Sequence, residues 1–194
     1  MTGARGAQRA LRGMQTAELE ARCRRILAEL SAVFAHLDVR PLGELAQMVL
    51  DARRVVCTGQ GRSGLIASAL AVRLVHLGRD AHVAGEATVP ALGCGDLLIA
   101  FSKSGTTATT AHQVVRAQHT GARVAVITGR TGADLAELAE LALVLPDLDA
   151  PSRQHAGSLF EQASLVLSDS LCGVLQHALG LSDRDLDARH DNLQ

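Results

Sequence analysis

Five short apolar runs alternate with helical patterns along most of this chain, and this alternation limits the fold more than any other feature. Each run is almost continuously apolar instead of alternating with polar residues, which is typical of strands buried on both faces. Strands separated by helices pair in parallel, with the helices packed on both faces of the sheet. The sequence therefore predicts an α/β fold with a five-stranded parallel sheet, whose strands fall at 53–59, 80–85, 95–102, 122–129 and 141–147.

Apolar residues at helical spacing occupy the intervals between the runs, and the same pattern continues after the last run. The long pattern at 158–180 is apolar on most of its circumference, which predicts burial or a place at a subunit interface. A short helix is expected at about 182–189. The remaining helices are predicted at 62–78, 106–121 and 131–140.

An N-terminal helical hairpin is predicted ahead of the sheet. Residues 18–38 carry one apolar stripe at helical spacing, and Pro41 suits the first turn of a second helix. The first 17 residues hold three arginines and no acid, so 1–17 is expected to be a disordered segment. Because no long linker interrupts the rest, 18–194 is predicted to be a single domain. The stripe consists of Ile26, Leu30, Val33, Phe34 and Leu37.

Composition excludes several classes of partner. The chain has 19 Lys and Arg against 20 Asp and Glu, and aromatic residues make up 2% with no Trp or Tyr. A nucleic-acid partner is not expected, because neither a basic field nor stacking side chains are available. No membrane contact is expected, since every apolar run ends well before about 18 residues.

Four widely spaced cysteines predict reduced thiols and a cytoplasmic location.

A glycine-rich turn follows the first predicted strand. Gly59, Gly61 and Gly64 form G-x-G-x-x-G, the pattern of a dinucleotide-binding loop, and Glu86 lies 22 positions after Gly64, where that pattern places an acid. Such strand-to-helix turns are common, so the match is weak. The alternative is that Gly61 makes a tight turn while Arg62 and Ser63 face a phosphorylated ligand.

A second loop, after the third predicted strand, favours this alternative. Four hydroxyls occur within the six residues from Ser102 to Thr107, at the expected start of a helix. One hydroxyl suffices to cap a helix, whereas several at a helix N-terminus suit a phosphate group. A terminal phosphate on a small molecule needs one dense cluster of donors. The predicted substrate-binding residues are Gly61, Arg62, Ser63, Ser102, Lys103, Ser104, Gly105, Thr106 and Thr107.

With both loops identified, the chain resembles the sugar-isomerase (SIS) family of phosphosugar-binding domains. The resemblance rests on S-x-S-G-x-T at Ser102–Thr107, on GRSG at Gly61–Gly64 and on the strand–helix order. Within that family it is most similar to the 6-phospho-3-hexuloisomerase group. The stretches that carry this closer match are GQGRSGLIASALAVRLVHLG, GEATVPALGCGDLLIAFSKSG, GSLFEQASLVLSD and RHDNLQ.

The resemblance implies a flavodoxin-like sheet, no cofactor and a homo-oligomer, expected to be a tetramer. It also implies interconversion of 3-hexulose 6-phosphate and fructose 6-phosphate. Two positions of the second loop depart from the family pattern, and both bear on which sugar is bound. Thr106 stands where Glu is common, and Lys103 stands where small residues are frequent.

Moving a carbonyl from C3 to C2 requires a base at a carbon-bound proton and donors for the oxyanion of a cis-enediol. Glu161 matches the proposed base of the family, and its neighbour Phe160 would make it a stronger base by excluding water. The competing interpretation is that Glu161 only complements the dipole of its helix. His190, in the RH-x-NL ending, is the candidate for ring opening or for moving protons between O2 and O3. No spacing of histidines predicts a metal site.

The sequence is compatible with three functions. The first is the isomerase, and the second is a phosphosugar sensor without catalysis, because SIS domains also serve as the ligand-binding halves of regulators. The third is an isomerase of the same fold that acts on another phosphosugar. The sequence has no basic recognition helix, which weighs against the sensor.

Since His190 lies 29 residues after Glu161, beyond a long helix, we expect it to act in a neighbouring subunit's site.

Overall fold

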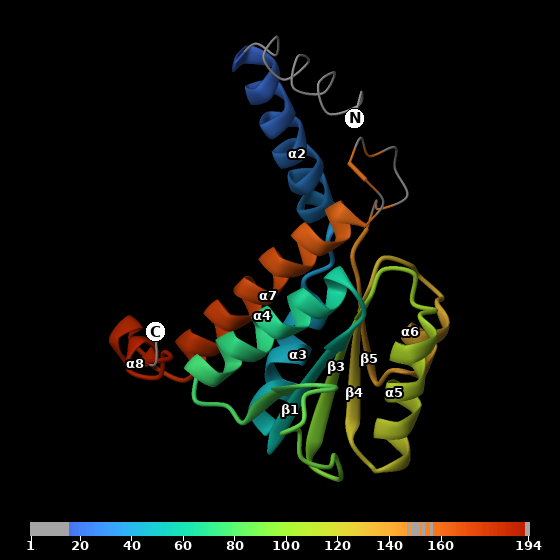
Figure 1. Ribbon diagram of the computed structural model, residues 1–194, viewed down its shortest axis with the longest axis vertical. Helices are drawn as coiled ribbons and strands as arrows, with labels where there is room; N and C mark the ends of the chain where they lie inside the picture. The colour runs from blue at the N-terminus through green and yellow to red at the C-terminus, as the bar shows by residue number, and fades with distance from the viewer. Residues whose placement is uncertain (1–15, 147, 149–151, 153, 156, 193–194) are drawn as a thin grey trace, which may run out of the picture.

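The computed structural model describes residues 16–146, 148, 152, 154–155 and 157–192, and it forms a parallel sheet between two layers of helices (Figure 1). The strands lie in the order β2-β1-β3-β4-β5, and every neighbouring pair is parallel. The five-stranded parallel sheet predicted from the sequence is confirmed. The strands are β1 (Arg54–Gly59), β2 (Ala81–Val83), β3 (Asp96–Ser102), β4 (Arg123–Thr128) and β5 (Leu141–Val144).

Helices cover both faces of the sheet, as expected. In Figure 1, α3, α4 and α7 lie on one face, and α5 and α6 lie on the other. The short α8 follows α7 at the end that points away from α2. The helices are α2 (Thr16–His36), α3 (Arg40–Asp51), α4 (Arg62–His76), α5 (Ala108–His119), α6 (Asp134–Leu138), α7 (Ser158–Ala178) and α8 (Asp183–Asp187).

Two apolar clusters, one on each face, explain why the strands lack polar alternation. Successive strand residues point to opposite faces. In β3, Leu97 and Ile99 join the cluster with α3, α4 and α7, whereas Leu98 and Ala100 join the cluster with α5 and α6. The middle of a strand between two helical layers is therefore apolar on both faces.

Several predicted elements are shorter than expected, and β5 covers only Leu141–Val144 of the predicted 141–147. The second strand covers only Ala81–Val83, because it lies at the edge of the sheet and a turn follows in which Gly85 has φ +98°. Glu86, the acid of the dinucleotide pattern, is exposed in this turn. The helix expected at 131–140 is limited to α6, five residues long.

The first helix extends beyond the body of the domain. Figure 1 shows α2 projecting past the start of α7, and only Val33 of α2 is buried. Ile26, which belongs to the predicted apolar stripe, is exposed because its part of the helix reaches past the core. Pro41 lies in the first turn of α3, as predicted. The disordered segment expected at 1–17 falls outside the described residues, except for the two that begin α2.

The strand order reverses between β1 and β3. From β1 the chain moves to the edge strand β2 and then crosses to β3 on the other side of β1. Ligands of open parallel sheets bind beyond the carboxyl ends of the strands at such a switch point. Gly59 pairs with Phe101 at these ends, so the loops that follow β1 and β3 start side by side.

Candidate active site

The glycines of the first loop are explained by close packing of α4 on β1. A Cβ atom on Gly59 would lie 2.7 Å from the backbone of Ser63, and one on Gly64 would lie 3.0 Å from the carbonyl oxygen of Gly59. Gly61, immediately before α4, has φ +57°, which favours glycine. The G-x-G-x-x-G spacing therefore has a structural cause here that needs no dinucleotide.

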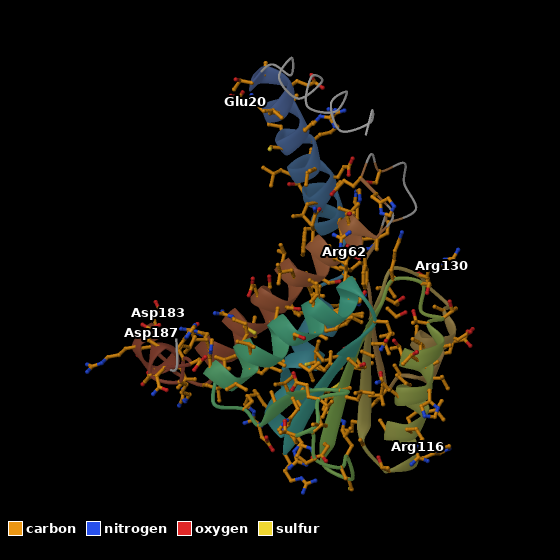
Figure 2. All side chains as sticks on the ribbon, in the orientation of Figure 1. Glu20, Arg62, Arg116, Arg130, Asp183 and Asp187 are labelled. Carbon is orange, nitrogen blue, oxygen red and sulfur yellow. The ribbon has the colours of Figure 1, made fainter. Side chains whose placement is uncertain are left out.

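Arg62 links this loop to the start of α7. Its Nη1 donates a hydrogen bond to the hydroxyl of Ser158 at 3.0 Å, and its Nη2 lies 2.8 Å from Oε2 of Glu161. In Figure 2, Arg62 lies at the end of α4 that meets the beginning of α7. The first turns of the two helices are thus joined through one guanidinium group.

Glu161 occupies the first turn of α7 with its side chain mostly enclosed. The side chain is 13% exposed, against 55% for Arg62. Although Nη2 of Arg62 is in ion-pair contact with Oε2, no described residue donates a well-directed hydrogen bond to this buried oxygen. Gly157, which precedes α7, has φ +98°, and a Cβ there would come within 3.0 Å of Oε1. The carboxylate is therefore held by one cation and lacks the donors that usually satisfy a buried oxygen.

The hydroxyls of the second loop bond to one another. Ser102 Oγ lies 3.0 Å from Thr107 Oγ1 and accepts a hydrogen bond from the N–H of Gly105. Ser104 Oγ accepts from the N–H and the hydroxyl of Thr106. Thr107 precedes α5, yet its side chain makes no cap hydrogen bond. The interpretation of these residues as helix caps is therefore not supported, and the N-terminus of α5 keeps its attraction for an anion.

The second loop is fixed in place by backbone contacts. The carbonyl of Gly105 accepts a hydrogen bond from the N–H of Leu135, and the carbonyl of Lys103 accepts one from the N–H of Gly129. Gly105 has φ +65°, and a Cβ on it would lie 2.3 Å from the Cβ of Ala133. The loop therefore has its shape before any ligand binds.

His190 is not near these groups. Its ring stacks on that of His76, the last residue of α4, with 4.6 Å between the ring centroids. Arg62 is the first residue of the same 15-residue helix. At about 1.5 Å per residue, the two ends of α4 are about 20 Å apart. The structure thus brings Arg62 and Glu161 together and places His190 at the opposite end of α4.

A polar network that was not predicted from the sequence lies before α7. Glu29 of α2 accepts hydrogen bonds from Ser152 Oγ at 2.7 Å and from Gln154 Nε2 at 3.0 Å, and Gln154 in turn accepts one from Gln162. A cavity of about 510 Å³ lies beside it and reaches the candidate site at Ser158. No local signal marks the contacts of Glu29, because its partners lie more than 100 positions away in the sequence. The cavity is lined by Arg22, Arg25, Ile26, Glu29, Gln154, His155 and Ser158.

Within the described part of the chain, no group of three or more His, Cys, Asp or Glu side chains is arranged to hold a metal ion. None of the described helices has the length and apolar character needed to cross a membrane.

Comparison with known proteins places this site in a family. The SIS domain model matches residues 48–163, which include β1 to β5 and the start of α7. The chain belongs to the SIS domain family. The match extends from the first glycine loop to Glu161, so both loops and the enclosed carboxylate lie within the family's domain.

Several relatives match over most of their length. A Mycobacterium gastri protein named 3-hexulose-6-phosphate isomerase is 36% identical over 86% of each chain. A Bacillus subtilis protein of the same name is 32% identical over 87% of this chain and 95% of its own. The crystal structure of a Methanococcus jannaschii protein, inferred to be a 3-hexulose-6-phosphate isomerase, superposes with a TM-score of 0.80. It is 26% identical and covers 90% of this chain and 99% of its own.

Proposed function

We propose that this protein is an isomerase that interconverts 3-hexulose 6-phosphate and fructose 6-phosphate through a cis-enediol. The observation that carries the proposal is the enclosed carboxylate of Glu161, paired with Arg62 at the switch point of the sheet. A buried carboxylate whose Oε2 lacks a directed donor is suited to take a proton from carbon. The names of the relatives support 3-hexulose 6-phosphate as the substrate of this chemistry.

The phosphate is assigned to the second loop. Backbone N–H groups at the start of α5 and the hydroxyls of Ser104, Thr106 and Thr107 supply donors without adding charge. Gly61, Arg62 and Ser63 follow the neighbouring strand and face the ligand from the other side. In this proposal the sugar lies between the second loop and the start of α7.

Glu161 is the proposed base. In the direction of fructose 6-phosphate, it removes the proton from C2, the C2–C3 enediol forms, and a proton returns to C3. The guanidinium of Arg62 lies within reach of the same space and stabilises the negative charge that develops on oxygen. In this direction oxidation at C2 is balanced by reduction at C3 of the same molecule, so the reaction needs no external redox cofactor.

His190 is proposed to serve the site of a neighbouring subunit in a homo-oligomer, expected to be a tetramer. Because His190 and Glu161 lie at opposite ends of α4 and α7, His190 does not reach the site of its own chain. Apolar side chains on the outer faces of α4 and α7 offer a surface for the contact. These exposed residues are Leu65, Val72, Val75, Leu165, Val166 and Val174.

We further propose that the protein works in the cytoplasm. The four cysteines are free thiols, two of them buried, which fits a reducing compartment.

A sensor without catalysis, or an isomerase for another phosphosugar, is favoured by one observation. Thr106 replaces the Glu that is common in the phosphate loop, and its hydroxyl is engaged with Ser104. A panel of phosphoketoses, assayed for conversion and for proton exchange in deuterated water, separates the three functions. Conversion of 3-hexulose 6-phosphate supports the proposal. Binding without exchange indicates a sensor, and exchange with another sugar alone indicates a different isomerase.

A further inference from the structure

The segment that carries His190 is fastened to the end of α4. Ser182 and Asp185 form a capping box that starts α8, and Leu186 of α8 is buried against the core. Arg189 then donates a hydrogen bond from Nη1 to the carbonyl oxygen of His76 at 3.3 Å. Its guanidinium also packs over Gly78, where a Cβ would come within 3.4 Å. The backbone just before His190 is thus fixed relative to α4.

The ring of His76 supports the ring of His190. The two imidazoles stack with 4.6 Å between centroids and 30° between planes, within the range of favourable aromatic pairs. His190 is exposed, whereas His76 is partly buried. Both rings line a cavity of about 480 Å³. His76 therefore contacts the C-terminal segment twice, through its carbonyl and through its ring.

The charges around the pair favour a neutral His76. Burial lowers the pKa of His76 below its usual value, and the nearby His190 and Arg73 lower it further. A neutral His76 ring places no positive charge against the imidazole of His190. The charged groups around the pair come from α4, α7, α8 and the segment after α8, and they are Arg73, Asp169, Asp183, Asp187, Arg189 and Asp191.

We infer that His76 is a positioning residue, whose ring fixes the plane of the His190 imidazole that a neighbouring subunit's site uses. The inference rests on the proposed function, in which His190 takes part in isomerisation. Figure 2 shows Asp183 and Asp187, which line the same cavity, beyond the end of α4 that lies away from Arg62. His76 consequently has no route to the phosphate or the base of its own chain, and acts through His190.

Removing the His76 ring leaves the imidazole of His190 present but unsupported. Small errors in the placement of a proton-transfer group reduce turnover strongly, whereas they leave ground-state binding nearly intact. We expect His76→Ala to lower kcat by about tenfold or more with KM within about twofold of wild type. His76→Phe keeps a flat ring in the stack and restores kcat to within about threefold.

The test compares these variants with His190→Ala and with His119→Ala, in which the exposed last residue of α5 is changed in the same way. NMR titration of the His76 imidazole supplies a second measurement. Because His190 lowers the pKa of His76, the midpoint is expected to rise in His190→Ala. The resonance is assigned by its absence in His76→Phe.

The inference is supported if His76→Ala loses kcat, His76→Phe recovers it and His119→Ala matches wild type. Wild-type kcat in His76→Ala, or no recovery in a folded His76→Phe, overturns it while the proposed function stands. An unchanged midpoint of His76 in His190→Ala also overturns it, because the rings are then not in contact in solution. Full activity of His190→Ala removes His190 from the proposed mechanism and this inference with it.

Discussion

Nη2 of Arg62 and Oε2 of Glu161 lie 2.8 Å apart, although the two residues are separated by almost 100 positions in the chain. The contact joins the first turns of α4 and α7 beside the switch point of the sheet. Arg62 lies on α4 and Glu161 lies on α7, so the two side chains meet only when both helices are correctly packed. The proposed chemistry depends on this pair more than on any other contact.

Glu161→Gln keeps the size of the side chain and removes its ability to take a proton. We expect kcat to fall by more than about 100-fold, the range for loss of a general base. Fructose 6-phosphate should still bind, because the phosphate loop is unchanged. Steady-state kinetics and calorimetry measure the two effects. Glu137→Gln, an exposed change in α6, is the control. Near wild-type turnover in Glu161→Gln would remove this residue from the mechanism.

The phosphate loop is tested by Ser104→Ala combined with Thr107→Ala. Calorimetry should show weaker binding of fructose 6-phosphate, because two hydroxyl donors are lost. The free energy of unfolding should change by only about 1 kcal/mol, the usual value for the hydrogen bond between Thr107 and Ser102, because the two bonds that Ser104 accepts from Thr106 are exposed to water. Thr109→Ala removes an exposed hydroxyl of α5 and should leave binding unchanged. Unaltered affinity in the double variant would mean that the phosphate binds elsewhere.

Gly105→Ala should destabilise the fold through two effects. The residue has φ +65°, and the new Cβ would lie 2.3 Å from that of Ala133. Gly132→Ala is a matched control, since Gly132 has φ +67° and open space around its Cβ position. Backbone strain alone costs about 1–3 kcal/mol, so denaturant unfolding should show that loss in the control and a larger loss in Gly105→Ala. Equal losses would show that the loop does not pack on Ala133 as described.

The acid dependence of stability should change in His76→Phe. Because the pKa of His76 is lowered by folding, the folded state takes up its proton at lower pH than the unfolded state does. Its contribution to stability is complete above the usual pKa of histidine, about 6.5, and is lost as the pH falls from there through the lower folded value. His76→Phe should lose less Tm than wild type between pH 7.5 and 5.5, roughly the span of this titration. Identical losses in thermal melts would contradict the lowered pKa.

A site shared between subunits can be detected by mixing two inactive variants. Glu161→Gln and His190→Ala are combined under conditions that exchange subunits. If each site takes Glu161 from one chain and His190 from another, about a quarter of the sites regain both residues. No recovery after proven exchange would place both groups in one chain or exclude His190 from catalysis.

Most of the fold follows from local sequence patterns, because the middle of a strand between two helical layers is apolar on both faces. The length of the edge strand β2 is overestimated from the sequence, because an apolar run does not show where strand pairing stops. Ile26 belongs to a regular stripe, yet it is exposed because α2 extends beyond the core. A stripe shows which face of a helix can be buried, but not how far the rest of the domain reaches.

The candidate site was predicted in part. The hydroxyl loop and the glycine turns are local, so the sequence revealed them and the structure supplied their hydrogen bonds. The contact of Ser158 with Arg62 and the stack of His76 on His190 join residues distant in the chain. Neither pair has a local signature, because they meet only when α4 and α7 lie side by side.

The central claim is that the protein forms an enediol between C2 and C3 of its substrate. Fructose 6-phosphate incubated with the protein in deuterated water, and followed by NMR, tests it at the level of single carbon atoms. We expect deuterium at C3 of fructose 6-phosphate and at C2 of the 3-hexulose 6-phosphate that forms, with both signals lost in Glu161→Gln. Deuterium at C1 alone, or full retention of hydrogen at C3 with no 3-hexulose 6-phosphate formed, would contradict the claim.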